Sequence, residues 1–66
     1  MQMISVSSAA ISAVGYDPIT KQMKIVFHQG GVYIFCGVPQ SVFDGLLAAG
    51  SKGAYYNTHI RDRYHC

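Results

Sequence analysis

The sequence predicts a small α+β domain, in which an antiparallel sheet of about three strands is packed by two short C-terminal helices. Three observations lead to this prediction. The chain has 66 residues, which suffices for a single domain, residues 1–66, with a thin core. Short segments of alternating apolar residues fill the first half and are separated by turn residues. Apolar residues at helical spacing follow in the second half.

Four segments of the first half have strand character. We expect only a short edge strand over residues 3–6. The main strands are predicted over residues 11–17, 22–28 and 32–37. Gly15 interrupts the first of these and indicates either a β-bulge or a close approach of another part of the chain.

The loop between the last two strands decides where the central aromatic side chains point. A two-residue loop would turn Tyr33 and Phe35 away from Phe27. A three-residue loop over residues 29–31 would pair Phe27 with Tyr33 and keep Lys24 off the apolar face, and we favour it. The face expected to form the core then carries Met23, Ile25, Phe27, Tyr33 and Phe35.

Two helices are predicted after the sheet. The first spans about residues 37–51, with Pro39 in its first turn and Gly50 as its stop. Gly45 weakens it by about 1 kcal/mol relative to alanine, which indicates close packing on the sheet. The second spans about residues 53–64, with Ser51 as its cap. The apolar stripes of the two helices are Val42, Phe43, Leu46 and Leu47, and Tyr56, Ile60 and Tyr64.

The ordered residues of the chain resemble the KTSC domain, a short module named after the C terminus of certain lysyl-tRNA synthetases. The family also includes free-standing small proteins of bacteria and phages. The matching residues run nearly end to end and include Val6-Ser7-Ser8, Val14-Gly15-Tyr16-Asp17, Ile25-x-Phe27, Tyr33-x-Phe35, Gly37-Val38-Pro39, Ser51-x-Gly53 and Ile60-Arg61.

The resemblance implies RNA binding, but one residue departs from the family pattern. The central signature of the family is Tyr-x-Tyr, and here it is Tyr33-Ile34-Phe35, with one hydroxyl missing. The second position therefore keeps packing or stacking and loses hydrogen bonding.

The C-terminal segment is the part of the chain that we expect to bind RNA, for example a tRNA-like molecule. Residues 1–51 carry two lysines and two aspartates, a net charge of zero, whereas residues 52–66 carry three basic residues against one aspartate, a net charge of +2. Basic side chains neutralise phosphates and tyrosine rings stack on bases. The predicted nucleic-acid-binding residues are Lys52, Tyr55, Tyr56, Arg61 and Arg63.

A protein-interaction module is the alternative. Charged residues make up only 12% of the chain, against a usual share of about 25%, so apolar patches are expected on the surface. The predicted interface is the outer sheet face with Val26, Ile34 and Cys36. Its partner would be a second copy of the chain or, if the protein is phage-encoded, a host protein.

We expect neither an enzyme nor a cofactor or metal site. Glutamate is absent, and the histidines and cysteines lack the spacing typical of zinc sites. A thiolate of Cys36 activated by His28 across the hairpin is conceivable, but such pairs more often lie side by side on an outer face. No signal peptide and no run of about 20 apolar residues is apparent. The sequence therefore predicts a cytoplasmic protein with reduced thiols, a frayed His65-Cys66 end and no membrane partner.

Overall fold

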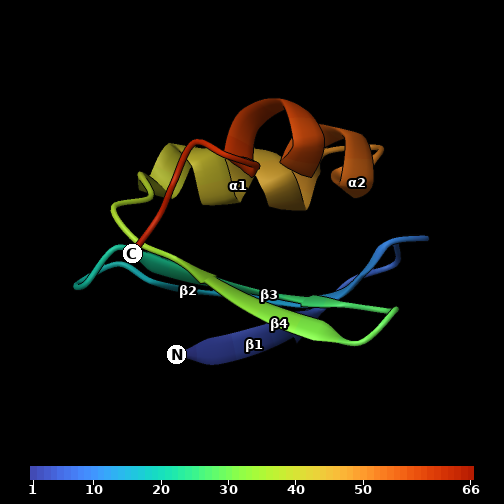
Figure 1. Cartoon of the computed structure of the whole chain (residues 1–66), viewed down its shortest axis with the longest axis horizontal. Coiled ribbons are helices and arrows are strands. Elements are labelled where there is room, and N and C mark those ends of the chain that lie inside the picture. The colour runs from blue at the N-terminus through green and yellow to red at the C-terminus, as the bar shows by residue number, and fades with distance from the viewer.

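The computed structural model describes all 66 residues and shows a four-stranded antiparallel sheet with helices over one of its faces (Figure 1). The strands are β1 (Gln2–Ser5), β2 (Ile11–Asp17), β3 (Gln22–Phe27) and β4 (Gly31–Phe35), and they neighbour one another in chain order. The helices are α1 (Gln40–Ala48), α2 (Lys52–Tyr55) and a π-helical turn, η1 (Tyr56–Ile60). The α+β class is confirmed, but the strand count is four rather than three.

The fourth strand, β1, lies at the edge of the sheet beside β2, where the sequence predicts a short edge strand over residues 3–6. All four of its residues are exposed, so it lacks the alternation of buried and exposed residues that identifies a half-buried strand. Gly15 permits this pairing, because a Cβ at that position would lie 2.6 Å from the Sδ atom of Met3. Gly15 therefore marks a close approach, whereas the irregularity in β2 occurs earlier, between Ile11 and Ala13.

The β3–β4 hairpin has a three-residue loop, as predicted, but over residues 28–30 instead of 29–31. Gly30 adopts the left-handed backbone conformation, with φ of +85°. As a result Phe27 pairs with Gly31 and Ile25 with Tyr33, a shift of two residues from the predicted register. A shift of two preserves the face of every side chain, so the predicted core face is correct. Phe35 is buried, but Tyr33 remains 54% exposed.

Nine apolar side chains form the core between the sheet and the helices. The sheet contributes Ile11, Val14, Met23, Ile25 and Phe35, and the segments after it contribute Val38, Phe43, Leu46 and Ile60. Burying one such aliphatic side chain stabilises the fold by about 1.5 to 3 kcal/mol. Ile60 is fully buried although it lies in the last turn of η1. Ile60 is therefore the fully buried anchor of the C-terminal segment, and the partly buried Tyr56 and Tyr64 pack against the same core.

The ends of the helices differ in part from the predictions. The Ser51 cap is confirmed, since its hydroxyl accepts a hydrogen bond from the Ala54 amide at 3.4 Å. Pro39, however, precedes α1 as its N-cap, and α1 ends at Ala48 with an extended Ala49, before Gly50 is reached. The prediction that Gly50 stops this helix is therefore wrong.

The second helix is shorter than the predicted span of 53–64. After α2 the backbone widens into a π-helical turn, in which the Arg61 amide donates to the carbonyl of Tyr56 at 2.8 Å. Asp62 then adopts a left-handed conformation, with φ of +62°, which aspartate tolerates better than most residues. This turn sends the last residues back to the sheet, where the C terminus lies (Figure 1).

The returning tail brings the two cysteines together in a disulfide. Cys36 follows β4 and Cys66 ends the chain, yet their Cα atoms lie 4.8 Å apart. The predictions of two reduced thiols and a frayed end are therefore wrong, because the reversal at Asp62 could not be read from residue spacing. Because Cys36 is bonded to Cys66, no Cys36 thiolate is present for His28 to activate. The His28 ring lies instead 2.9 Å from the carbonyl oxygen of Ser8.

The face of the sheet opposite the helices carries no covering layer (Figure 1). Val32 and Ile34 are about half exposed on it, and Met3 is 38% exposed. Lys24 stands between Gly15 and Ile34 in the cross-strand pairing and interrupts the apolar surface. No helix of the protein combines the length and the hydropathy needed to cross a membrane.

Candidate nucleic-acid interface

An open cleft of about 740 Å³ lies beside the β3–β4 loop. Three aromatic residues and one arginine line it, namely Phe27, Tyr33, Tyr56 and Arg61, and we call it the aromatic cleft. Its other lining residues are Ala9, Ala10, Gln29, Gly30 and Gly31. Its size falls within the roughly 300 to 1,000 Å³ of small-ligand sites. The cleft therefore offers room for one flat group beside several aromatic rings.

The three rings come from three elements, and Phe27 lies between the two tyrosines. Phe27 and Tyr33 point to the same face of the sheet from β3 and β4, and Tyr56 opens η1 above them. The centroid of the Phe27 ring lies 5.5 Å from that of Tyr33 and 5.1 Å from that of Tyr56. The planes meet at 76° and 72°, an edge-to-face geometry that stabilises aromatic pairs.

Gly31 allows the Tyr33 ring to reach this position. A Cβ on residue 31 would lie 2.9 Å from Cε2 of Tyr33, closer than side-chain atoms normally approach. The two glycines of the hairpin thus have separate tasks, since Gly30 supplies the left-handed turn and Gly31 supplies space for the ring.

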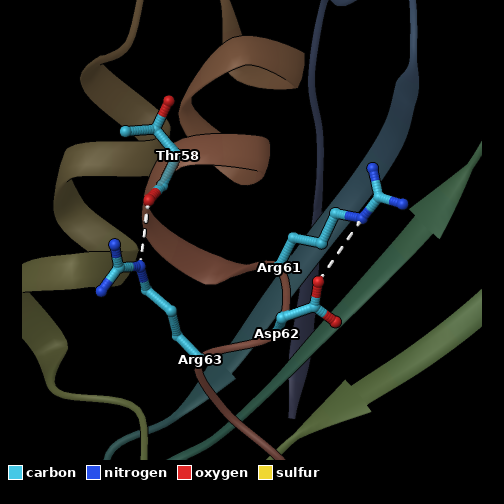
Figure 2. A network of polar contacts seen from close by, with 4 residues as sticks. All are labelled: Thr58, Arg61, Asp62 and Arg63. Carbon is cyan, nitrogen blue, oxygen red and sulfur yellow. Dashed lines mark hydrogen bonds and ion pairs between the residues drawn. The ribbon is translucent and has the colours of Figure 1, made fainter.

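Arg61 brings positive charge to the cleft. Its Nε atom lies 4.0 Å from a carboxylate oxygen of Asp62, and both side chains are largely exposed, at 63% and 87%. Such exposed ion pairs contribute little, so the guanidinium group remains available to an anionic ligand. Arg63 extends from the opposite side of the segment and donates from Nε to the carbonyl of Thr58 at 3.0 Å (Figure 2).

The five predicted binding residues do not form one surface. Tyr56 and Arg61 meet in the aromatic cleft, whereas Arg63 lies on the other side of its segment. Lys52 donates from Nζ to the carbonyl of Ala49 at 3.0 Å, and the Tyr55 hydroxyl donates to the carbonyl of Val42 at 3.0 Å. The part that each of the five plays in binding stays a prediction.

Sequence reasoning missed Phe27 and Tyr33 as cleft residues, because it assigned both rings to the core. The missed signal lies in the position of Tyr33. It stands on the last strand of the sheet, two residues after the glycine loop, so no further strand covers it.

Tyr56 carries a shifted ionisation that can be measured. Burial raises the pKa of Tyr56 above its usual value of 10.0, and the charge of Arg61 opposes this effect. Because the folded pKa is raised, the contribution of the neutral phenol to stability is complete below pH 10.0 and is lost as the pH rises through the folded pKa.

We therefore expect Tyr56→Phe to reduce the loss of stability at alkaline pH. Urea unfolding of both proteins below and above pH 10.0 measures the loss of stability. Absorbance titration of tyrosinate in the two proteins gives a difference curve that belongs to Tyr56, and its midpoint should lie above pH 10.0. Identical alkaline stability profiles would contradict the prediction.

Tyr55 is held against α1 by Gly45, and this contact yields a second prediction. A Cβ on residue 45 would lie 2.2 Å from the Tyr55 hydroxyl oxygen, so the glycine accommodates Tyr55 rather than the sheet. We expect Gly45→Ala to destabilise the protein by up to about 2 kcal/mol, since overpacking costs about 1 to 3 kcal/mol and the helix gains about 1 kcal/mol. In a Tyr55→Ala background the same change should stabilise by about 1 kcal/mol. Urea unfolding of the four proteins checks this reversal of sign, and equal effects in both backgrounds would refute it.

The fold and the cleft define a small α+β domain made of a four-stranded antiparallel sheet with short helices on one face. The model of the KTSC domain family matches residues 7–64, so the chain belongs to the KTSC domain family. The resemblance found in the sequence is thereby confirmed.

Known proteins of three kinds are similar to this chain. A protein of Tsukamurella paurometabola is 42% identical over 62 residues, covering 94% of this chain and 92% of that protein. The crystal structure of a KTSC domain protein from Yersinia pestis superposes with a TM-score of 0.95 at 34% identity, covering 98% of this chain and 92% of that one. A lysine–tRNA ligase of a Nostoc species is 33% identical over 54 residues, which are 82% of this chain but only 10% of the ligase.

Proposed function

We propose that this KTSC domain binds RNA without catalysing a reaction, through the aromatic cleft and Arg61. The observation that carries the proposal is the meeting of three aromatic rings and an available guanidinium group in one open cleft. Aromatic rings and arginine are the groups by which proteins hold the bases and phosphates of RNA.

The similarity to a lysine–tRNA ligase supports RNA as the ligand class. The relative of the Nostoc species acts on tRNA by its name, and the part similar to this chain is about a tenth of it. A domain attached to such an enzyme is well placed to contact tRNA. A tRNA is therefore the first RNA to test with this protein.

Binding of tRNA is expected to weaken steeply as salt is added, because phosphate contacts release counterions. Fluorescence anisotropy with labelled tRNA, at a series of salt concentrations, measures this dependence. Arg61→Gln should lower the affinity and reduce the slope of log affinity against log salt by about 1. Arg63→Gln is the matched control, since it removes the same charge from the far side of the same segment (Figure 2) and should have a smaller effect. Absence of binding at low salt would refute the proposal.

We propose that the protein works in the cytoplasm, as the sequence predicts. The Cys36–Cys66 disulfide argues against this location, because disulfides are uncommon in the cytoplasm. Alkylation of free thiols in intact cells that express the protein, followed by mass analysis of Cys36 and Cys66, tests the location. Two alkylated cysteines would support the cytoplasm and show that the disulfide does not form there, whereas a complete disulfide would refute a cytoplasmic location.

The uncovered sheet face favours self-association as a second candidate function. Val26 and Ile34 lie on this face as predicted, together with Val32, and Ile34 and Val32 are 49% and 56% exposed. Cys36 belongs to the disulfide and offers no free thiol to a partner. A second copy is the occupant we favour over a host protein, because a small, weakly charged protein with an apolar face tends to associate.

Two sets of variants separate the candidates. Val26→Asp or Ile34→Asp should convert a dimer into a monomer in light scattering and leave RNA binding intact. The double change Arg61→Gln with Arg63→Gln should weaken RNA binding and leave the dimer intact. A wild-type protein that is monomeric at high concentration would refute self-association.

A further inference from the structure

We infer that the aromatic cleft holds a single unpaired nucleotide, with its base against the tyrosine rings and its phosphate at Arg61. The inference rests on the proposed function and deepens it, because it names the form of RNA that the site accepts. The same chemistry is present in a free nucleotide and in an unpaired nucleotide of an RNA chain.

The first argument is the character of the walls. A ligand that enters the cleft meets the rings of Tyr33 and Tyr56, with Phe27 between them at centroid distances of 5.5 and 5.1 Å. Aromatic rings bind bases by stacking, which requires a free π-face on the base. In a duplex each base is already stacked on its neighbours, so only an unpaired base can use these walls.

The second argument is the exposure of Tyr33. Its side chain is 54% exposed although the ring stands on the core face of the sheet, so a large aromatic surface stays open to solvent. Phe35, two residues further along the same strand, is only 8% exposed. Tyr33 is therefore accessible to a ligand, whereas its neighbour on that face is committed to the core.

The third argument is the placement of charge. Arg61 is the only charged residue that lines the cleft, and its weak exposed contact with Asp62 leaves donors free. A planar guanidinium group binds phosphate through paired hydrogen bonds. Arg61 would therefore bind the phosphate of the same nucleotide whose base lies against the aromatic rings.

The size of the cleft also limits the ligand. Its volume of about 740 Å³ lies in the range of sites that enclose one small molecule. The edge of the cleft at the β3–β4 loop is open, since an added Cβ on Gly30 would meet no atom within 4 Å. The RNA chain on either side of the bound nucleotide can thus continue into solvent at this edge.

The test compares three ligands for the full chain: labelled oligouridylate, the same strand paired with oligoadenylate, and AMP as a competitor. We expect the single strand to bind roughly 5- to 150-fold more tightly than the duplex, the factor that one base–aromatic stack supplies. AMP should displace the oligonucleotide only weakly, because the neighbouring phosphates of the strand are also attracted by the net charge of +2 on residues 52–66.

Variants of Tyr33 assign the effect to the cleft. Tyr33→Leu removes the ring and should bring the affinity for the single strand down to that for the duplex. The conservative variant Tyr33→Phe keeps the ring and should retain most of the preference. Circular dichroism and urea unfolding check the fold of both variants. We expect both to fold, because Tyr33 is half exposed.

The outcomes separate the inference from the proposed function. Equal binding of single strand and duplex, weakened by Arg61→Gln, would overturn the inference and leave RNA binding in place. Absence of binding to either RNA at low salt would overturn both. Displacement by AMP at the affinity of the oligonucleotide would keep the nucleotide in the cleft and overturn RNA as its source.

Discussion

Replacing Cys36 and Cys66 together by serine is expected to lower the free energy of unfolding by about 3 to 4 kcal/mol. The two residues lie 30 positions apart, and closing a loop of that length restricts the unfolded chain by about this amount in the loop-entropy model. A domain of 66 residues has a total stability of roughly 3 to 10 kcal/mol. Loss of the disulfide should therefore remove a third or more of the stability.

Urea unfolding with and without a reducing agent measures this effect. The wild-type protein should lose stability on reduction, and the reduced protein should match the double serine variant. The variant is its own control, because its unfolding curve should not respond to the reducing agent. A loss below about 1 kcal/mol would show that the disulfide does not restrict the unfolded chain as the loop-entropy model requires.

The second large effect is expected for Ile60→Ala. Ile60 is fully buried in the core at the end of η1, and truncation of a buried isoleucine costs about 2 to 5 kcal/mol, because lost burial adds to the cavity that remains. The loss should also disturb the aromatic cleft, since Tyr56 and Arg61 lie on the same segment as Ile60.

Ile19→Ala is the matched control. Ile19 is 90% exposed in the turn after β2, so the same chemical change should alter stability by less than about 0.5 kcal/mol. Urea unfolding of both variants gives the comparison, and amide chemical shifts of Tyr56 and Arg61 report on the cleft. Similar losses in the two variants would contradict the assignment of Ile60 to the core.

Much of the fold could be predicted because its signals are local. The alternation in residues 22–27 places Met23 and Ile25 in the core, as observed, and the face of each strand residue survives a register error of two positions. The Ser51 cap is likewise a matter of a few neighbouring residues. The sequence predicts a short edge strand over residues 3–6, and β1 forms over Gln2–Ser5; only the strand count is too low, because the exposed residues of β1 show no alternation.

The candidate site was harder to predict, because it depends on how separate elements meet. The residue types of Tyr56 and Arg61 predict RNA contacts, and the two side chains do line one cleft. Tyr55 has the same side chain as Tyr56 but turns to α1, where Gly45 leaves space for it. Arg63 differs from Arg61 by two positions and points to the other side (Figure 2). Helical spacing places Tyr56 in one stripe with Ile60 and so separates it from Tyr55, but no local pattern separates Arg61 from Arg63.

The α+β class, the core face of the sheet and the membership of the KTSC domain family can be read from the sequence, because they depend on periodicity and on the order of residues along the chain. Only the packing of distant segments shows that Cys36 bonds to Cys66 and that Phe27, Tyr33 and Arg61 line one cleft. The π-helical turn and the left-handed Asp62 shape the segment that carries Arg61 and Cys66. Both direct the C-terminal segment over the sheet through packing between residues far apart in the chain.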